Sequence, residues 1–187
     1  MVLGALAAAV VAALLATALR PRIGTASAVS VAGLLWSLVA IALVTLVPTR
    51  AEVGVVPAES RSEACSWDYG GPSGAAFEVL GFDQRTLNVL LFVPAGLFLV
   101  LAVGRWWSGL LLAPVGLAAL AAYSLAIEFT QLQLARLDRA CDVTDMVDNI
   151  LGAGIGFAMG LVLLPVVRPW RGRRPPRPPA PEVPLAH

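Results

Sequence analysis

Long apolar runs make up most of the chain, and the polar positions fall between them in short stretches. Crossing a bilayer takes about 20 mostly apolar residues in a helix that rises about 1.5 Å per residue. The runs that qualify are Val2 to Leu19, Ala28 to Val47, Leu87 to Val103, Leu110 to Ile127 and Ile150 to Val167. The first could instead be a signal peptide, but no positive charge precedes it. The pattern predicts an all-α, polytopic membrane helical bundle of about five transmembrane helices.

Composition supports the membrane interpretation. The chain is 58% hydrophobic and only 13% charged, whereas a soluble domain carries about 25% charged residues. Its mean hydropathy is +0.81. The net charge of +1 provides no overall basic field to attract nucleic acid. We therefore expect a multi-pass protein of the cell membrane that has the lipid bilayer around it and no nucleic-acid partner.

The arginines are unevenly distributed among the loops, and no lysine is present. If the C-terminus is cytoplasmic, eight of the 13 basic residues lie inside. These are Arg20, Arg22, Arg105, Arg168, Arg171, Arg173, Arg174 and Arg177. The reverse orientation would put the arginines of the tail on the face that the positive-inside rule disfavours. We therefore predict that the N-terminus lies outside and the C-terminus in the cytoplasm.

Two loops and a tail complete the predicted organisation. Residues 1–167 form the membrane domain, with extracytoplasmic loops at 48–86 and 131–144. Residues 168–187 are basic and proline-rich, a composition typical of a disordered segment. This cytoplasmic tail would either contact anionic lipid or serve only to determine topology.

The only two cysteines, Cys65 and Cys141, fall one in each predicted loop. In an oxidising extracytoplasmic space they could form a disulfide. Such a bond closes a long loop and would stabilise the fold by about 4 kcal/mol. The alternative is two free thiols on unrelated loops. We favour the disulfide, because both loops are predicted on the same side.

The densest polar pattern directly precedes the last apolar run. On a helix, Asp142, Asp145 and Asn149 lie on one stripe because their spacing follows the 3.6-residue period. Acidic residues in a first turn also suit the positive end of the helix dipole. Either Asp142 or Thr144 could cap this helix. The pattern predicts a polar pocket where the helix begins.

Further along the same stripe, the polar residues give way to glycine. Gly152, Gly156 and Gly160 are each four residues apart. Small residues at this spacing let another helix approach closely within a membrane. We predict a helix-packing face here, which would also suit a partner subunit or a second copy of the chain.

Other polar side chains are predicted at the same membrane face. Glu128 and Gln131 are three residues apart at the end of the fourth apolar run, so they share a side of that helix. Ionisable groups near lipid are costly and tend to mark function. The predicted ligand-binding residues are Asn88, Glu128, Gln131, Arg139, Asp142, Asp145 and Asn149. For Asp83, Arg85 and Asp148, an ion-pair network that closes the bundle is the simpler interpretation.

The sequence lacks the residues that several kinds of site require. The only histidine is His187, so a zinc site, a haem ligand and a Ser-His pair are not expected. The chain has no phosphate-binding G-x-x-x-x-G-K-[ST] loop and no C-x-x-C motif. We therefore expect no cofactor and no dedicated metal site. A Mg²⁺ or Ca²⁺ ion bound by Glu128, Asp142 and Asp145 would still be compatible with the sequence.

Three motifs, taken together, resemble the VanZ-like family of bacterial membrane proteins. They are NVLLFVPAG from Asn88 to Gly96, IEFTQ from Ile127 to Gln131, and RACDVTDMVDNILG from Arg139 to Gly152. Their order and separations are also similar to the family pattern. The resemblance covers about Leu87 to Gly160, and the first two apolar runs match only in character. Asp148 departs from the pattern, because the family usually carries an apolar residue there.

The resemblance implies a polytopic protein linked to glycopeptide resistance, teicoplanin especially, but it implies no chemical mechanism. The hypothesis we favour is binding of a polar lipid or a lipid-linked cell-wall precursor in an outer-face pocket. Arg139 would contact its phosphate or carboxylate, since the planar guanidinium suits either. A second hypothesis is a carboxylate- or metal-dependent hydrolase or transferase acting on envelope lipids. A third is a structural partner subunit held through the glycine face.

Overall fold

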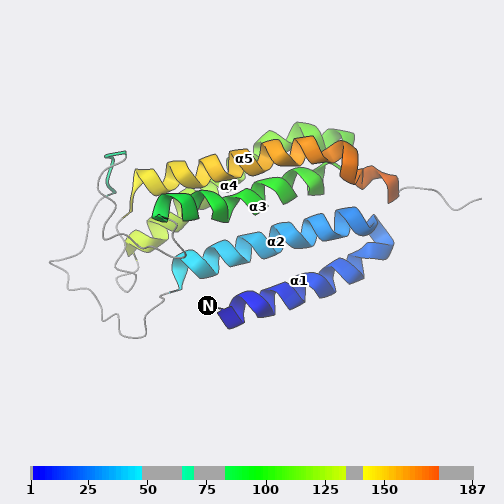
Figure 1. Cartoon of the computed structure of the whole chain (residues 1–187), viewed down its shortest axis with the longest axis horizontal. Helices are drawn as coiled ribbons and strands as arrows, with labels where there is room; N and C mark the ends of the chain where they lie inside the picture. Colours follow the sequence, from blue (N-terminus) through cyan, green and yellow to red (C-terminus); the bar gives the residue numbers. More distant parts are fainter. Residues whose placement is uncertain (1, 48–64, 70–82, 134–140, 173–187) are drawn as a thin grey trace, which may run out of the picture.

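The computed structural model of the chain describes residues 2–47, 65–69, 83–133 and 141–172 (Figure 1). Its helices are α1 (Val2–Ile23), α2 (Thr25–Leu46), α3 (Gln84–Val103), α4 (Trp107–Gln133), α5 (Val143–Val167) and the short 3-10 helix η2 (Pro169–Gly172). Five of them are long and apolar enough to cross a membrane. The prediction of an all-α bundle of about five membrane-spanning helices is confirmed.

The helices run lengthwise beside one another (Figure 1). The most extensive packing joins α3 to α5, while α1 packs against α2 and α2 against α3. α4 packs against both α3 and α5. Among the described side chains of α1 none is buried, so this helix lies at the edge of the bundle. A core of apolar side chains from the other helices includes Ile41, Phe92, Leu99, Leu120 and Ile127.

The bundle has two chemically different ends. At the polar end, α3 and α5 begin and α2 and α4 finish, as the hydrogen bond from Gln131 Nε2 to the Thr45 carbonyl (3.0 Å) illustrates. At the arginine end, α1, α3 and α5 finish. The described arginine side chains there are Arg20, Arg22, Arg105 and Arg168. The described acidic side chains therefore lie at the polar end, and the described arginines other than Arg85 lie at the arginine end.

Two helices begin earlier than the apolar runs suggested. α3 starts at Gln84 rather than near residue 87, because Asp83 accepts a hydrogen bond from the Thr86 amide at 2.8 Å and caps the helix. α5 starts at Val143 rather than near residue 150, because Asp142 accepts from the Thr144 amide at 2.8 Å. Hydropathy detects only the apolar part of a helix, whereas a capping side chain marks where the backbone begins to turn.

The other boundaries also shift. α4 continues to Gln133, beyond the predicted end near residue 127, so the expected loop at 131–144 is shorter on both sides. The tail predicted as disordered begins with a structured turn, η2, which directly follows α5. Ser27 Oγ donates to the Pro169 carbonyl at 3.1 Å and ties this turn to α2. Residues 173–187, like 48–64 and 70–82, lie outside the described residues.

The glycine stripe of α5 is a close contact with α3. A Cβ atom added at Gly152 would overlap the carbonyl of Val89, and one at Gly156 would overlap the carbonyl of Val93. The contact is reciprocal, since a Cβ at Gly96 of α3 would overlap the backbone of α5. At Gly160 a Cβ would lie 2.8 Å from Val100 Cβ. The two backbones are therefore in direct contact, as small residues in membrane helices allow.

This contact corrects one part of the partner-subunit hypothesis. That hypothesis depended on the face of Gly152, Gly156 and Gly160 being available to another chain. In the fold the face is occupied by α3 of the same chain. A homo-oligomer stays a prediction, and it would have to form through a different surface.

The contact predicts a large difference between two neighbouring glycines of α5. Gly156→Ala should lower the free energy of unfolding by about 2–3 kcal/mol, because the added methyl meets backbone that cannot move aside. Gly154→Ala is the matched control, since a Cβ there has no neighbour within 4 Å. Alanine is also the better helix former, by about 1 kcal/mol. Thermal unfolding of both variants in detergent measures the difference, and equal midpoints would contradict the packing.

Candidate functional site at the polar end

The first turns of α3 and α5 place a carboxylate between two amides. Asp145 Oδ1 accepts from Asn88 Nδ2 at 2.7 Å, and its Oδ2 accepts from Gln84 Nε2 at 2.9 Å. Asn88 and Gln84 are four residues apart on α3, so their side chains point to the same neighbour. The Asp145 carboxylate is half-buried and held in a fixed orientation by neutral donors from the adjacent helix.

Beside it lies an ion pair between Arg85 and Asp148. Arg85 Nε donates to Asp148 Oδ2 at 2.9 Å and Nη2 donates to Oδ1 at 3.1 Å, a two-point contact. The Asp148 side chain is 3% exposed, whereas that of Arg85 is 39% exposed. Arg85 Nη2 also donates to the Tyr69 hydroxyl at 2.8 Å, and the guanidinium carbon lies 5.1 Å from the centre of the Tyr69 ring. These contacts support the structural interpretation of Arg85 and Asp148.

Asp83, the third member of the expected ion-pair network, has a different role. It caps α3, as described above. Hydrogen bonds from the side chain and then the backbone of Thr86 lower the pKa of Asp83 below its usual value. It is therefore a structural carboxylate at the entry to α3.

α4 adds a second buried carboxylate. Glu128 is 2% exposed, and its Oε2 accepts from the Asp142 backbone amide at 3.4 Å. That amide belongs to the residue that caps α5, so Glu128 lies beside the start of the helix that carries Asp145. Two carboxylates from different helices therefore lie around the first turn of α5.

One helical turn further into the bundle, α4 and α5 share a polar contact. Asn149 Nδ2 donates to Ser124 Oγ at 3.0 Å, and both residues are buried. The other polar atom of this amide, Asn149 Oδ1, is buried and has no hydrogen-bond partner among the residues that the structure describes. Ser124 was not among the predicted site residues, although its position four residues before Glu128 puts it on the same side of α4.

A short segment of the long loop is fixed over the starts of α5 and α3. Cys65 and Cys141 form a disulfide with their Cα atoms 4.5 Å apart. Ser66 then pairs with the strand-like backbone before α5. Its amide donates to the Cys141 carbonyl at 2.8 Å, and its carbonyl accepts from the Val143 amide at 3.0 Å. With Tyr69 bound to Arg85, residues 65–69 connect the entry of α5 to that of α3.

The predicted ligand-binding residues that the structure describes therefore gather at one end but not in one shared contact. Asn88 and Asp145 meet, and so do Glu128 and Asp142. Gln131 binds the end of α2 instead, as described above. Arg139 lies outside the described residues. Gln84, Ser124 and Tyr69 also contribute and were not foreseen as site residues, because uncharged groups in or near apolar runs give little signal.

The structure gives no support to a metal-ion alternative within the described ranges. In residues 2–47, 65–69, 83–133 and 141–172, no group of three or more His, Cys, Asp or Glu side chains is placed to hold a metal ion. Glu128, Asp142 and Asp145, the set considered for Mg²⁺ or Ca²⁺, do not form one. What the described geometry offers is hydrogen bonding by carboxylates and amides.

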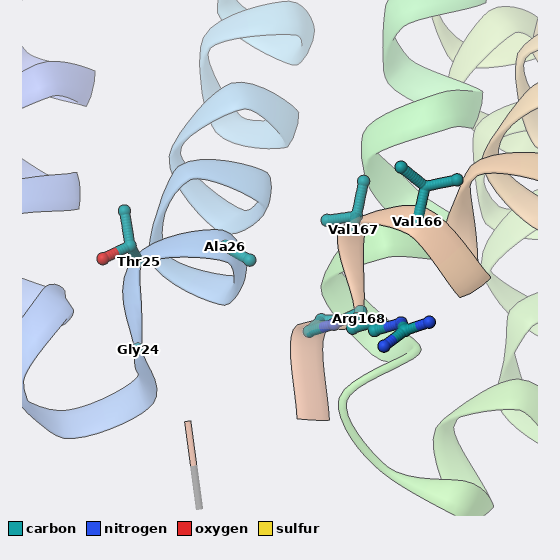
Figure 2. Close-up of a pocket in the computed structure, with 7 residues that line it drawn as sticks. Gly24, Thr25, Ala26, Val166, Val167 and Arg168 are labelled. Carbon is teal, nitrogen blue, oxygen red and sulfur yellow. The ribbon is translucent and has the colours of Figure 1, made fainter. Parts of the chain in front are cut away.

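A cavity of about 260 Å³ lies at the opposite, arginine end. It is lined by residues 24–26 at the start of α2 and residues 166–169 at the end of α5. Figure 2 shows these two segments facing each other, with the side chain of Arg168 directed away from α2. Its Nε donates to the Pro165 carbonyl of its own helix at 2.7 Å. This cavity contains none of the predicted site residues.

Comparison with known proteins identifies a protein family. A family model described as VanZ/LLP1 matches residues 6–164, which is nearly the whole chain and includes the first two helices. No curated protein and no solved structure gives a match.

The ion pair predicts a characteristic pattern of stabilities. Arg85→Met leaves the buried Asp148 carboxylate without its partner and should cost about 2 kcal/mol, less than a fully buried pair because Arg85 is partly exposed. The double variant Arg85→Met/Asp148→Leu removes both charges and should recover most of that loss. Unfolding midpoints of the single and double variants measure this. A double variant that loses as much stability as Arg85→Met, or more, would contradict the structural role of the pair.

Proposed function

The chain belongs to the VanZ/LLP1 family, and from that premise we propose that it binds a polar headgroup at its polar end. The ligand would be a membrane lipid or a lipid-linked cell-wall precursor of the envelope. Membership makes the chain a VanZ-like membrane protein and ties it, at the level of the family, to glycopeptide resistance. Binding rather than catalysis is the activity that we propose.

The observation that carries the proposal is the pair of carboxylates around the start of α5. Glu128 is almost fully buried, and Asp145 is half-buried between amide donors from α3. Taking a carboxylate out of water costs several kcal/mol, so such groups near lipid tend to be retained for function. Neighbouring amides can both donate and accept, which suits recognition of a polar headgroup.

Structural roles at this end are already assigned to other groups. The Arg85–Asp148 ion pair and the glycine contact join α3 to α5, and Asp83 and Asp142 cap the helices. Glu128 lies beside the capped start of α5, where its Oε2 accepts from the Asp142 amide. We propose that a ligand at the polar end donates hydrogen bonds to this same carboxylate.

We further propose that the polar end faces outward and the arginine end faces the cytoplasm. Arg20, Arg22, Arg105 and Arg168 lie at the arginine end, and the positive-inside rule puts such a cluster on the cytoplasmic side. The N-terminus would then lie outside, as the sequence predicts. The ligand would accordingly be a component of the outer leaflet or the cell wall.

Conservative changes of the two carboxylates should abolish binding. Glu128→Gln and Asp145→Asn keep the shape and remove the charge, so lipids that co-purify with the wild-type protein should fall at least tenfold. Asp83→Asn is the matched control, because asparagine caps a helix as well as aspartate does. Mass spectrometry of the bound lipid provides the measurement, with membrane levels of each variant checked in parallel. Unchanged lipid in both variants would refute the proposal, and a chemically altered lipid would indicate an enzyme.

Labelling of intact cells tests the orientation. In a background with both native cysteines replaced by serine, Gln133→Cys at the polar end should react with a membrane-impermeant thiol reagent. Arg22→Cys at the arginine end should react only after the cells are opened. The opposite labelling pattern would reverse the proposed topology and place the carboxylates in the cytoplasm.

A further inference from the structure

Asn149 and Ser124 form a buried polar pair with unused hydrogen-bonding capacity. Asn149 is 3% exposed and Ser124 is fully buried. Their one mutual bond uses an amide hydrogen of Asn149 and a lone pair of Ser124 Oγ. Among the described residues, Asn149 Oδ1 has no partner and the Ser124 hydroxyl makes no second hydrogen bond. A buried acceptor without a hydrogen bond destabilises the fold, so a further partner for Asn149 Oδ1 would be favourable.

The pair is the inward continuation of the proposed binding site. Ser124 is four residues before Glu128 on α4, and Asn149 is four residues after Asp145 on α5. Because the two helices run in opposite directions, both steps lead the same way, about 6 Å deeper into the bundle. The packing of α5 against α3 depends on its glycines, so this pair is not required for that contact.

We propose that Ser124 and Asn149 are an inner subsite that binds a hydroxyl group of the ligand, an inference that rests on the proposed function. A hydroxyl can donate to Asn149 Oδ1 and at the same time accept from the Ser124 hydroxyl. An ionised phosphate has no hydrogen to donate, and an ammonium group has no lone pair to accept with. The ligand class is therefore a lipid whose headgroup carries a sugar or another polyol. The carboxylates of Glu128 and Asp145 are acceptors suited to neighbouring hydroxyls.

A double variant tests the subsite without leaving a polar atom unpaired. Ser124→Ala/Asn149→Leu removes the whole pair, and loss of both partners of a hydrogen bond is close to neutral for stability. The probes are a polyprenyl phosphate and the same lipid carrying one hexose, each added to the purified full-length protein in nanodiscs. The wild-type protein should bind the hexose-bearing lipid at least tenfold more tightly than the bare phosphate. The double variant should bind the two lipids equally and melt within a few degrees of the wild type.

One single variant refines the test. Ser124→Thr retains a hydroxyl and should retain the preference for the hexose-bearing lipid. An unchanged preference in the double variant would overturn the subsite. A double variant that fails to fold would also overturn it, because the pair would then be a structural element that holds a buried water.

The same assay separates failure of the subsite from failure of the proposed function. If Asp145→Asn loses both lipids while the double variant behaves as the wild type, the proposed function stands and the subsite is wrong. If the wild-type protein binds neither lipid, headgroup binding at the polar end is itself refuted.

Discussion

Direct contact between the backbones of α3 and α5 is the constraint on which the rest of the structure depends. Apolar side chains gain little by leaving lipid for another apolar surface, so membrane helices associate through close packing and polar contacts. Glycines on α5 provide that packing, and they lie on the same stripe as Asp145. Once Gly152 and Gly156 are seated against α3, the rotation and depth of α5 are fixed. Asp145 then meets Asn88, and Asp148 meets Arg85.

The side chains at the polar end differ in how their hydrogen-bonding atoms are paired. Asp148 is fully engaged by a cation, and Asp145 is bound by two neutral amides. Deeper in the bundle, Asn149 Nδ2 is hydrogen-bonded, whereas its Oδ1 has no partner in the part of the chain that the structure describes. In a low-dielectric interior an unmet polar atom costs more than it does at the surface. Hydrogen-bond pairing therefore becomes less complete inward along α5, from Asp145 and Asp148 to Asn149.

The fold was predictable because composition and apolar run length respond directly to the bilayer. The glycine face of α5 was predictable too, because Gly152, Gly156 and Gly160 follow the helical period, and these glycines contact α3. Periodicity does not predict which helix packs against the glycine face. The contact of Gly96 with α5 and the hydrogen bond from Gln84 to Asp145 are therefore known only from the three-dimensional structure. Ser124 illustrates the same limit, since one hydroxyl in an apolar run has no distinctive pattern. The pairing of Asp148 with Arg85 explains how a charge is tolerated at this buried position.

The disulfide has a consequence for how the protein is made. Cys65 precedes α3, and Cys141 follows α4, 76 residues later. The bond can form only after both intervening helices have crossed the membrane and returned the chain to the compartment that holds the first sulfur. The disulfide therefore forms late in biosynthesis, after both α3 and α4 have been inserted. A chain in which only one of these two helices had inserted would hold its sulfurs on opposite sides of the membrane and could not form the bond.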